Sequence, residues 1–190
     1  MRYPISKQHR ALIFWSLFVL NGVIMYWMSG PLTTPAAPLG IVSLELAGTP
    51  ANARTIIDSW DAAARAHAVF SVRLDYLYLL TYSTVMSIGC MWAASQVREH
   101  KWLARIGLYL AWLQWLAALL DAIENVGLLQ MLAGDTMQPW PLIAQWFAMP
   151  KFALLALGLA YIFLIGGSLW LRNRLSKAPA QPVTTLLNDL

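Results

Sequence analysis

Cysteine is almost absent from this chain, since Cys90 is the only one among 190 residues. A disulfide within the chain, a thiolate-ligated metal and an iron–sulfur cluster are therefore excluded, and we interpret Cys90 as a small packing residue. Charge is scarce as well. Asp, Glu, Lys and Arg supply 12% of the residues, about half of the ~25% typical of soluble domains.

Histidine is rare, and the three histidines, His9, His67 and His100, all lie outside the apolar runs. A haem held by axial histidines within a helical bundle is therefore not expected. The zinc-hydrolase motif H-E-x-x-H is missing, a Ser-His-Asp triad lacks a histidine among the apolar helices, and no glycine-rich phosphate loop is present. The sequence thus predicts neither a metal site nor a cofactor.

Apolar residues make up 59% of the chain, and uncharged runs are long: 11–44, 76–97, 106–120 and 152–171. About 20 apolar residues are needed to cross the ~30 Å hydrocarbon layer of a membrane. The run 106–120 reaches that length only if its helix continues through Asp121 and Glu124. We therefore predict an all-α polytopic membrane protein, an antiparallel bundle of four transmembrane helices with an extracytoplasmic amphipathic helix.

Basic residues predict the topology of this bundle, because positively charged flanks stay in the cytoplasm. They precede the first span, fill the link between the second and third, and follow the fourth: Arg2, Lys7, Arg10, Arg98, Lys101, Arg105, Arg172, Arg174 and Lys177. Both termini are expected in the cytoplasm of a bacterial cell, with the protein in its inner (plasma) membrane. The formal net charge is +4, but the charged residues gather at the ends of the spans, so no nucleic-acid partner is predicted.

The predicted organisation has four parts. Residues 1–30 form the cytoplasmic N-terminus and first span, 31–72 the external segment, 73–172 the second to fourth spans, and 173–190 a disordered cytoplasmic tail. The apolar stretch 11–28 is longer than the ~7–15 residues of a signal peptide, so we expect it to be a retained anchor.

The external segment begins with a proline-rich stretch, "GPLTTPAAPLG", which disfavours a long helix. Thr49 and Pro50 then have the character of an N-cap and a first helical residue. A helix follows over 51–73, with one apolar stripe and two i,i+4 ion pairs: the stripe is Ile57, Trp60, Ala64 and Ala68, and the pairs are Arg54 with Asp58 and Asp61 with Arg65. We expect this helix to lie on the membrane or on the bundle and to continue into the second span with a bend near Ser71.

Four charged residues fall within or beside the apolar spans, Asp75, Asp121, Glu124 and Lys151. Counted from the cytoplasmic basic residues at ~1.5 Å per residue, they share a level roughly 24 to 35 Å from the inner boundary. This level is near the outer edge of the hydrocarbon core. A charge enclosed at such a depth requires a partner, so we predict an ion pair between Glu124 and Lys151.

Polar residues at helical spacing extend this level into a candidate pocket that opens to the outside. Gln114, Asp121 and Asn125 share one stripe and Asp75, Tyr78 and Tyr82 another, with tyrosine hydroxyls able to donate to carboxylates. The candidate ligand-binding or proton-relay residues are Asp75, Tyr78, Tyr82, Asp121, Glu124, Asn125 and Lys151, with Glu45 and Arg73 at the rim. The alternative is that the charges mark the membrane interface, that the tyrosines are packing residues and that Asn21 makes a helix–helix hydrogen bond.

Three functions fit these features. The first is binding or transport of a small molecule, lipid or ion, with Asp121 as a proton acceptor. The second is an accessory or assembly subunit of a membrane complex. The third is a membrane-embedded enzyme acting on a lipid or isoprenoid, with Asp75, Asp121 or Glu124 as acid and base. The expected partners are membrane lipids, a small-molecule or lipid ligand, and a second copy or a partner membrane protein.

Overall fold

Residues 7–176 are described by the structure, which is a computed structural model of the chain. Over this range the fold is all-helical, as predicted: α1 (Lys7–Met28), α2 (Ile41–Glu45), α3 (Pro50–Asp58), α4 (Ala62–Gln96), α5 (Lys101–Leu132) and α6 (Trp140–Ser176). Helices α4, α5 and α6 are long and apolar enough to cross a membrane, while α1 holds a shorter apolar stretch, Leu12–Met28. The predicted tail 173–190 overlaps the end of α6, and the rest of it lies outside the described residues.

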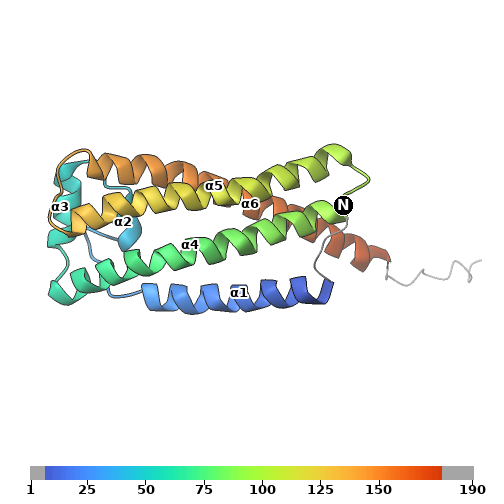
Figure 1. The fold of residues 1–190 in the computed structure, drawn as a ribbon, viewed down its shortest axis with the longest axis horizontal. Coiled ribbons are helices and arrows are strands. Elements are labelled where there is room, and N and C mark those ends of the chain that lie inside the picture. Colours follow the sequence, from blue (N-terminus) through green and yellow to red (C-terminus); the bar gives the residue numbers. More distant parts are fainter. Residues whose placement is uncertain (1–6, 177–190) are drawn as a thin grey trace, which may run out of the picture.

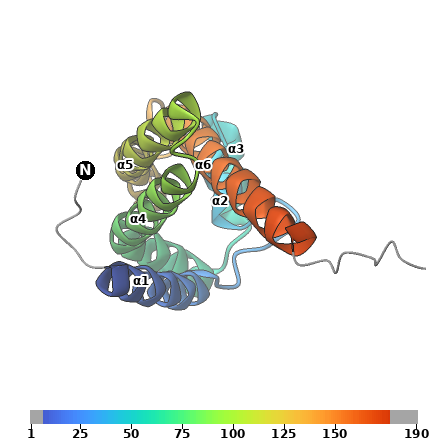
Figure 2. The same ribbon diagram turned by 90° about the vertical axis from the view of Figure 1, so that its right-hand side faces the viewer.

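The four long helices alternate in direction along the molecule (Figure 1). Helix α4 is central, because it packs against α1, α5 and α6, and α5 packs in turn against α6. Helix α1 has its main contact with α4 and stands at one edge of the molecule (Figure 2). The well-packed unit is therefore the trio α4, α5 and α6, to which α1 is added on the α4 side.

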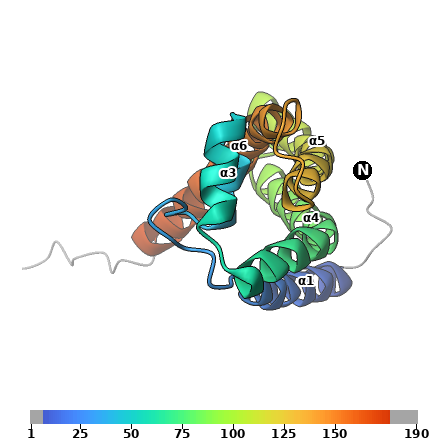
Figure 3. The same cartoon turned by 90° about the vertical axis from the view of Figure 1, so that its left-hand side faces the viewer.

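A cap, which we define as residues 30–61, covers one end of the bundle (Figure 3). It contains α2 and α3, and its apolar side chains share a buried core with the facing ends of the long helices. Leu44 and Ile56 from the cap belong to the same core as Leu128 of α5 and Ala144 of α6. The two predicted locations for this segment were the membrane surface and the helical bundle, and the structure shows it packed on the bundle.

The predicted continuous helix over 51–73 is wrong, because α3 ends at Asp58 and α4 begins at Ala62, with three residues between them. Asp61 explains the restart, since its carboxylate accepts a 2.7 Å hydrogen bond from the Ala64 N–H and caps α4. Thr49 caps α3 as predicted, accepting from the Asn52 N–H at 3.2 Å. The predicted stripe is buried in spite of the break, at Ile57, Trp60, Ala64 and Ala68.

No helix boundary falls at Ser71, where a bend was expected; α4 continues through it to Gln96. The Ser71 hydroxyl donates a 3.0 Å hydrogen bond to the Met28 carbonyl at the end of α1. That bond satisfies one of the carbonyls that a helix end leaves without a partner. Ser71 therefore joins α4 to α1.

The two predicted i,i+4 ion pairs are also wrong. Arg54 instead donates through Nε to the Thr136 hydroxyl at 2.8 Å, in the loop between α5 and α6. Arg65 pairs with Asp58 at 3.2 Å across the break between α3 and α4, while Asp61 is occupied as a cap. The chain reversal decides these partners, because it brings loop residues within reach that a single straight helix would keep distant.

Glycine sets the approach of α5 to α6 at the capped end. A Cβ atom at Gly127 would lie 3.0 Å from the Trp140 carbonyl oxygen and 3.4 Å from the Ala144 nitrogen, both backbone atoms of α6. At Gly167, by contrast, a Cβ atom would meet nothing within 4 Å. Close helix packing in membranes relies on such small residues, so Gly127 positions the two helices that carry most of the buried charges.

We predict that Gly127→Ala lowers the free energy of unfolding by about 1–3 kcal/mol, because the added methyl group presses on backbone that cannot rotate away. Gly167→Ala is the matched control and should leave stability equal or slightly higher, since Ala favours helix over Gly by roughly 0.5–1 kcal/mol. Denaturant unfolding in detergent would measure both. Equal effects of the two substitutions would contradict the close approach.

Candidate functional site

Lys151 of α6 is buried, with 5% of its surface exposed. Its Nζ lies 2.7 Å from Glu124 Oε2, 2.9 Å from Asp121 Oδ1 and 3.5 Å from Glu45 Oε2. The predicted ion pair of Lys151 with Glu124 is thus confirmed. We call these four residues the Lys151 cluster. A lysine ammonium has three N–H donors, and here each has a carboxyl group within ion-pair distance.

Three elements supply the Lys151 cluster. Asp121 and Glu124 are three residues apart on α5 and so lie on one helix face, whereas Glu45 ends the short helix α2. Glu45 was predicted only as a rim residue, and the structure places it in direct contact with Lys151. The reason is tertiary: the cap turns back over the bundle and inserts α2 beside α5 and α6.

Helix α4 adds hydrogen bonds around the cluster. Tyr82 donates its hydroxyl to Asp121 Oδ2 at 2.9 Å, so this carboxylate is bound on both oxygens. Asn125 of α5 donates through Nδ2 to Asp75 Oδ2 at 2.6 Å. Asp75 makes no ion pair with Lys151 among the described residues. It is therefore a fourth acidic group beside the cluster, held by an amide.

Two candidate residues point elsewhere. The Tyr78 hydroxyl lies 3.8 Å from the Met25 sulfur of α1, and its ring contacts the Tyr82 ring with centroids 5.3 Å apart. Tyr78 therefore links α1 to the site without contacting the cluster through its hydroxyl. Arg73 is exposed and has no hydrogen bond or ion pair within residues 7–176.

Two polar residues predicted within the spans bind helix backbone or neighbouring side chains. Gln114 is fully buried and donates to the carbonyls of Leu110 and Leu154, while its Oε1 has no donor among the described groups. Asn21 of α1 accepts a 3.1 Å hydrogen bond from the Thr81 hydroxyl of α4. The predicted helix–helix role of Asn21 is confirmed.

The cluster carries more acid than base. Three carboxyl groups surround one ammonium, so full ionisation would leave a net charge of −2 (one positive and three negative charges) in a buried site. Uncompensated charge is costly away from water. Glu124 is fully buried, and its Oε1 has no hydrogen-bond donor within the described chain. The arrangement can therefore take up a positive species, a proton or a cation.

Glu45 lies outside the candidate membrane-crossing helices, and its pKa is affected both by burial and by the charges of the cluster. Burial raises the pKa of the Glu45 carboxyl above its ordinary value of 4.5, and the Lys151 ammonium opposes that rise. Among residues 7–176, no group of three or more His, Cys, Asp or Glu side chains is arranged to hold a metal ion.

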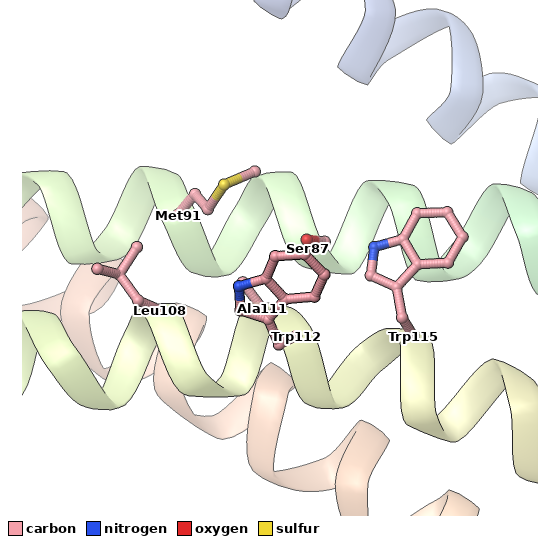
Figure 4. Close-up of a pocket in the computed structure, with 6 residues that line it drawn as sticks. All are labelled: Ser87, Met91, Leu108, Ala111, Trp112 and Trp115. Atoms are coloured by element: carbon pink, nitrogen blue, oxygen red, sulfur yellow. The ribbon is translucent and has the colours of Figure 1, made fainter. Parts of the chain in front are cut away.

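The predicted pocket open to the outside is not what the structure contains, because the cap covers the cluster and every member is at most 8% exposed. Two grooves are found elsewhere. One, of about 240 Å³, lies between α4 and α5 and is lined by Ser87, Met91, Leu108, Ala111, Trp112 and Trp115 (Figure 4). The other, of about 250 Å³, lies on the cap beside Asn52 and Thr55. Neither is lined by a member of the cluster.

Comparisons with known proteins give no relative for this chain: no protein-family model, no curated protein and no solved structure matches it. The case for a function rests on the geometry of the Lys151 cluster and on its setting in apolar helices.

We predict that Lys151→Met lowers the free energy of unfolding by about 3–5 kcal/mol, because it leaves buried carboxyl groups without their cation. Adding Glu124→Gln should restore part of the loss by removing one acidic group. The control is Arg65→Met, which breaks an ion pair whose side chains are 45% and 74% exposed and should cost less than about 1 kcal/mol. Chemical unfolding of the purified variants in detergent would measure these effects. A loss for Lys151→Met no larger than the control's would show that the cluster adds little stability.

Proposed function

We propose that the protein is an integral membrane protein with four spans, in which α1 crosses the membrane in addition to α4, α5 and α6. The cap lies on the extracytoplasmic side. The basic link around Arg98, Lys101 and Arg105 joins α4 to α5, at the end of the molecule opposite the cap (Figure 1). Since basic links stay in the cytoplasm, this placement supports cytoplasmic termini.

The single cysteine allows a direct test of this topology. In a Cys90→Ser background, we expect Ala51→Cys in the cap and Ala133→Cys after α5 to react with a membrane-impermeant maleimide on intact cells. Glu99→Cys, in the basic link, should react only after permeabilisation. All three positions are exposed. Labelling of Glu99→Cys in intact cells would contradict the proposed orientation.

We infer that the function is binding of a small positive ion at the Lys151 cluster. The observation that carries this proposal is the convergence of Glu45, Asp121 and Glu124 on one buried lysine. Ionisable groups enclosed in membrane proteins cost stability and usually serve ion or ligand sites. The small size of the ligand is supported by the burial of the cluster under the cap and by the two grooves, neither of which is lined by a cluster member.

Binding from the capped side is better supported than passage through the bundle. The buried core at the other end of the helices includes Cys90, Leu110, Tyr161 and Ile165. The buried acidic and basic residues in the described part of the chain are the four of the Lys151 cluster, at the capped end. A proton or ion crossing the end opposite the cap would lack charged groups to stabilise it. The lipid-modifying enzyme has less support, because two of its three proposed acid–base residues, Asp121 and Glu124, are buried.

The accessory-subunit alternative is favoured by one surface. Beside the groove between α4 and α5, Tyr109 is 70% and Trp112 77% exposed. Neither the Tyr109 hydroxyl nor the Trp112 N–H has a hydrogen-bond partner within the described residues. In a membrane, a partner protein could cover these aromatic side chains and accept their hydrogen bonds. Co-purification of a stoichiometric partner in mild detergent would favour this function.

We expect the thermal unfolding midpoint of the purified protein to depend on pH or on the concentration of an alkali cation. If the ligand is a proton, the sign follows from Glu45. Because the pKa of Glu45 is raised in the folded state, proton binding stabilises that state. The stabilisation is full below pH 4.5, the ordinary pKa of the group, and is lost as pH rises through the pKa of the folded state. The midpoint should therefore fall with rising pH.

Glu45→Gln should reduce this dependence, and Glu99→Gln, at an exposed position in the basic link, should retain it. A wild-type unfolding midpoint that changes with neither pH nor the concentration of an alkali cation would overturn ion binding.

A further inference from the structure

The hydrogen-bond donors around the Lys151 cluster are fewer than the carboxyl oxygens. Lys151 can donate three N–H groups, and Tyr82 adds one hydroxyl to Asp121. The cluster's carboxyl groups contain six oxygens. Neither Glu124 oxygen has a hydrogen-bond donor within the described residues, although Lys151 Nζ lies 2.7 Å from Oε2, and the residue has no exposed surface. With four donors for six oxygens, the cluster has room for at least one further donor.

The missing donor has an evident place. Glu45 Oε2 and Glu124 Oε2 lie 3.5 Å and 2.7 Å from the same Lys151 Nζ, which brings the two carboxyl groups together around one ammonium. Two ionised carboxylates side by side repel each other, whereas a pair that shares one proton forms a hydrogen bond. A proton on this pair would lower the negative charge of the cluster by one and satisfy a buried oxygen.

We propose, building on the ion-binding function, that the bound ion is a proton and that Glu45 and Glu124 share it. In forming this site one carboxylate takes up a proton to become a carboxylic acid, which donates to the other carboxylate. Lys151 remains an ammonium paired with Asp121. The folded site then carries a net charge of −1, and the proton ties the cap to α5.

A proton suits the site better than an alkali cation because an ammonium already occupies its centre. Lys151 Nζ lies within 3.5 Å of all three carboxyl groups. A metal cation binding the same oxygens would stand against this positive charge at short range. In agreement, no acidic group of three or more members within residues 7–176 has an arrangement that fits a metal.

The charged surroundings of Glu45 come from every long helix of the packed trio. Lys151 faces it from α6 and Asp121 and Glu124 from α5, and Asp75 of α4, held by Asn125, adds a further negative charge that acts on it. Within the cap itself, no other titratable side chain makes an ion pair with Glu45 among the described residues. Burial raises the pKa of Glu45, which agrees with a bound proton.

Infrared spectroscopy tests this proposal directly, because a carboxylic acid has a C=O stretch that a carboxylate lacks. The wild-type protein, in an ester-free detergent at neutral pH, should show that band. The band should shift when glutamate is labelled with ¹³C and stay when aspartate is labelled. Glu45→Gln and Glu124→Gln should each remove it, and Glu99→Gln, at an exposed position, should keep it.

The outcomes separate the proton from the wider ion-binding function. No carboxylic acid band in the wild type, or a band that follows the aspartate label, would overturn the shared proton. A band that sodium chloride removes at constant pH, while the same concentration of choline chloride does not, would also overturn it and leave cation binding standing. Since the isotope labels use the wild-type chain, the result holds even where a glutamine variant fails to fold.

Discussion

The ammonium of Lys151 is the point on which the arrangement of the capped end depends. It holds carboxyl groups from α2 and α5, and it stands on α6. A charge in this setting is stable only with partners at short range, because removing one member of a buried pair leaves the other without compensation. That requirement ties the cap and α5 to α6, together with the apolar packing of the cap and the close approach of α5 to α6 at Gly127.

The apolar core of the cap and the Lys151 cluster reinforce each other. Leu44 precedes Glu45 directly and is fully buried in the core that joins α2 and α3 to the long helices. Its burial carries Glu45 inward. The apolar core also excludes water, and low polarity strengthens the ion pairs while it increases the cost of any excess charge. A proton that relieves this excess would therefore be bound as part of the fold.

The same reasoning divides the molecule into two regions. The capped end contains the buried charges and the proposed proton, while the opposite end packs through uncharged buried residues such as Cys90 and Tyr161. Between them, Gln114 binds only backbone carbonyls. Helix α1 joins α4 through Asn21 and Tyr78. A site that responds to conditions on one side of a membrane suits this division better than a pathway through it.

The sequence by itself determined the helical class, the N-cap at Thr49 and the pairing of Glu124 with Lys151. These follow from local composition and from counting along a helix, since residues a known number of positions apart differ in height by a known distance. It did not determine the break at Asp61, the hydrogen bond of Arg54 to Thr136 or the place of Glu45. Each of these depends on where the chain turns back, and the turn is decided by apolar packing between segments distant in sequence. Sequence spacing places a side chain on its own helix, but only the tertiary structure determines which side chains of other elements it meets.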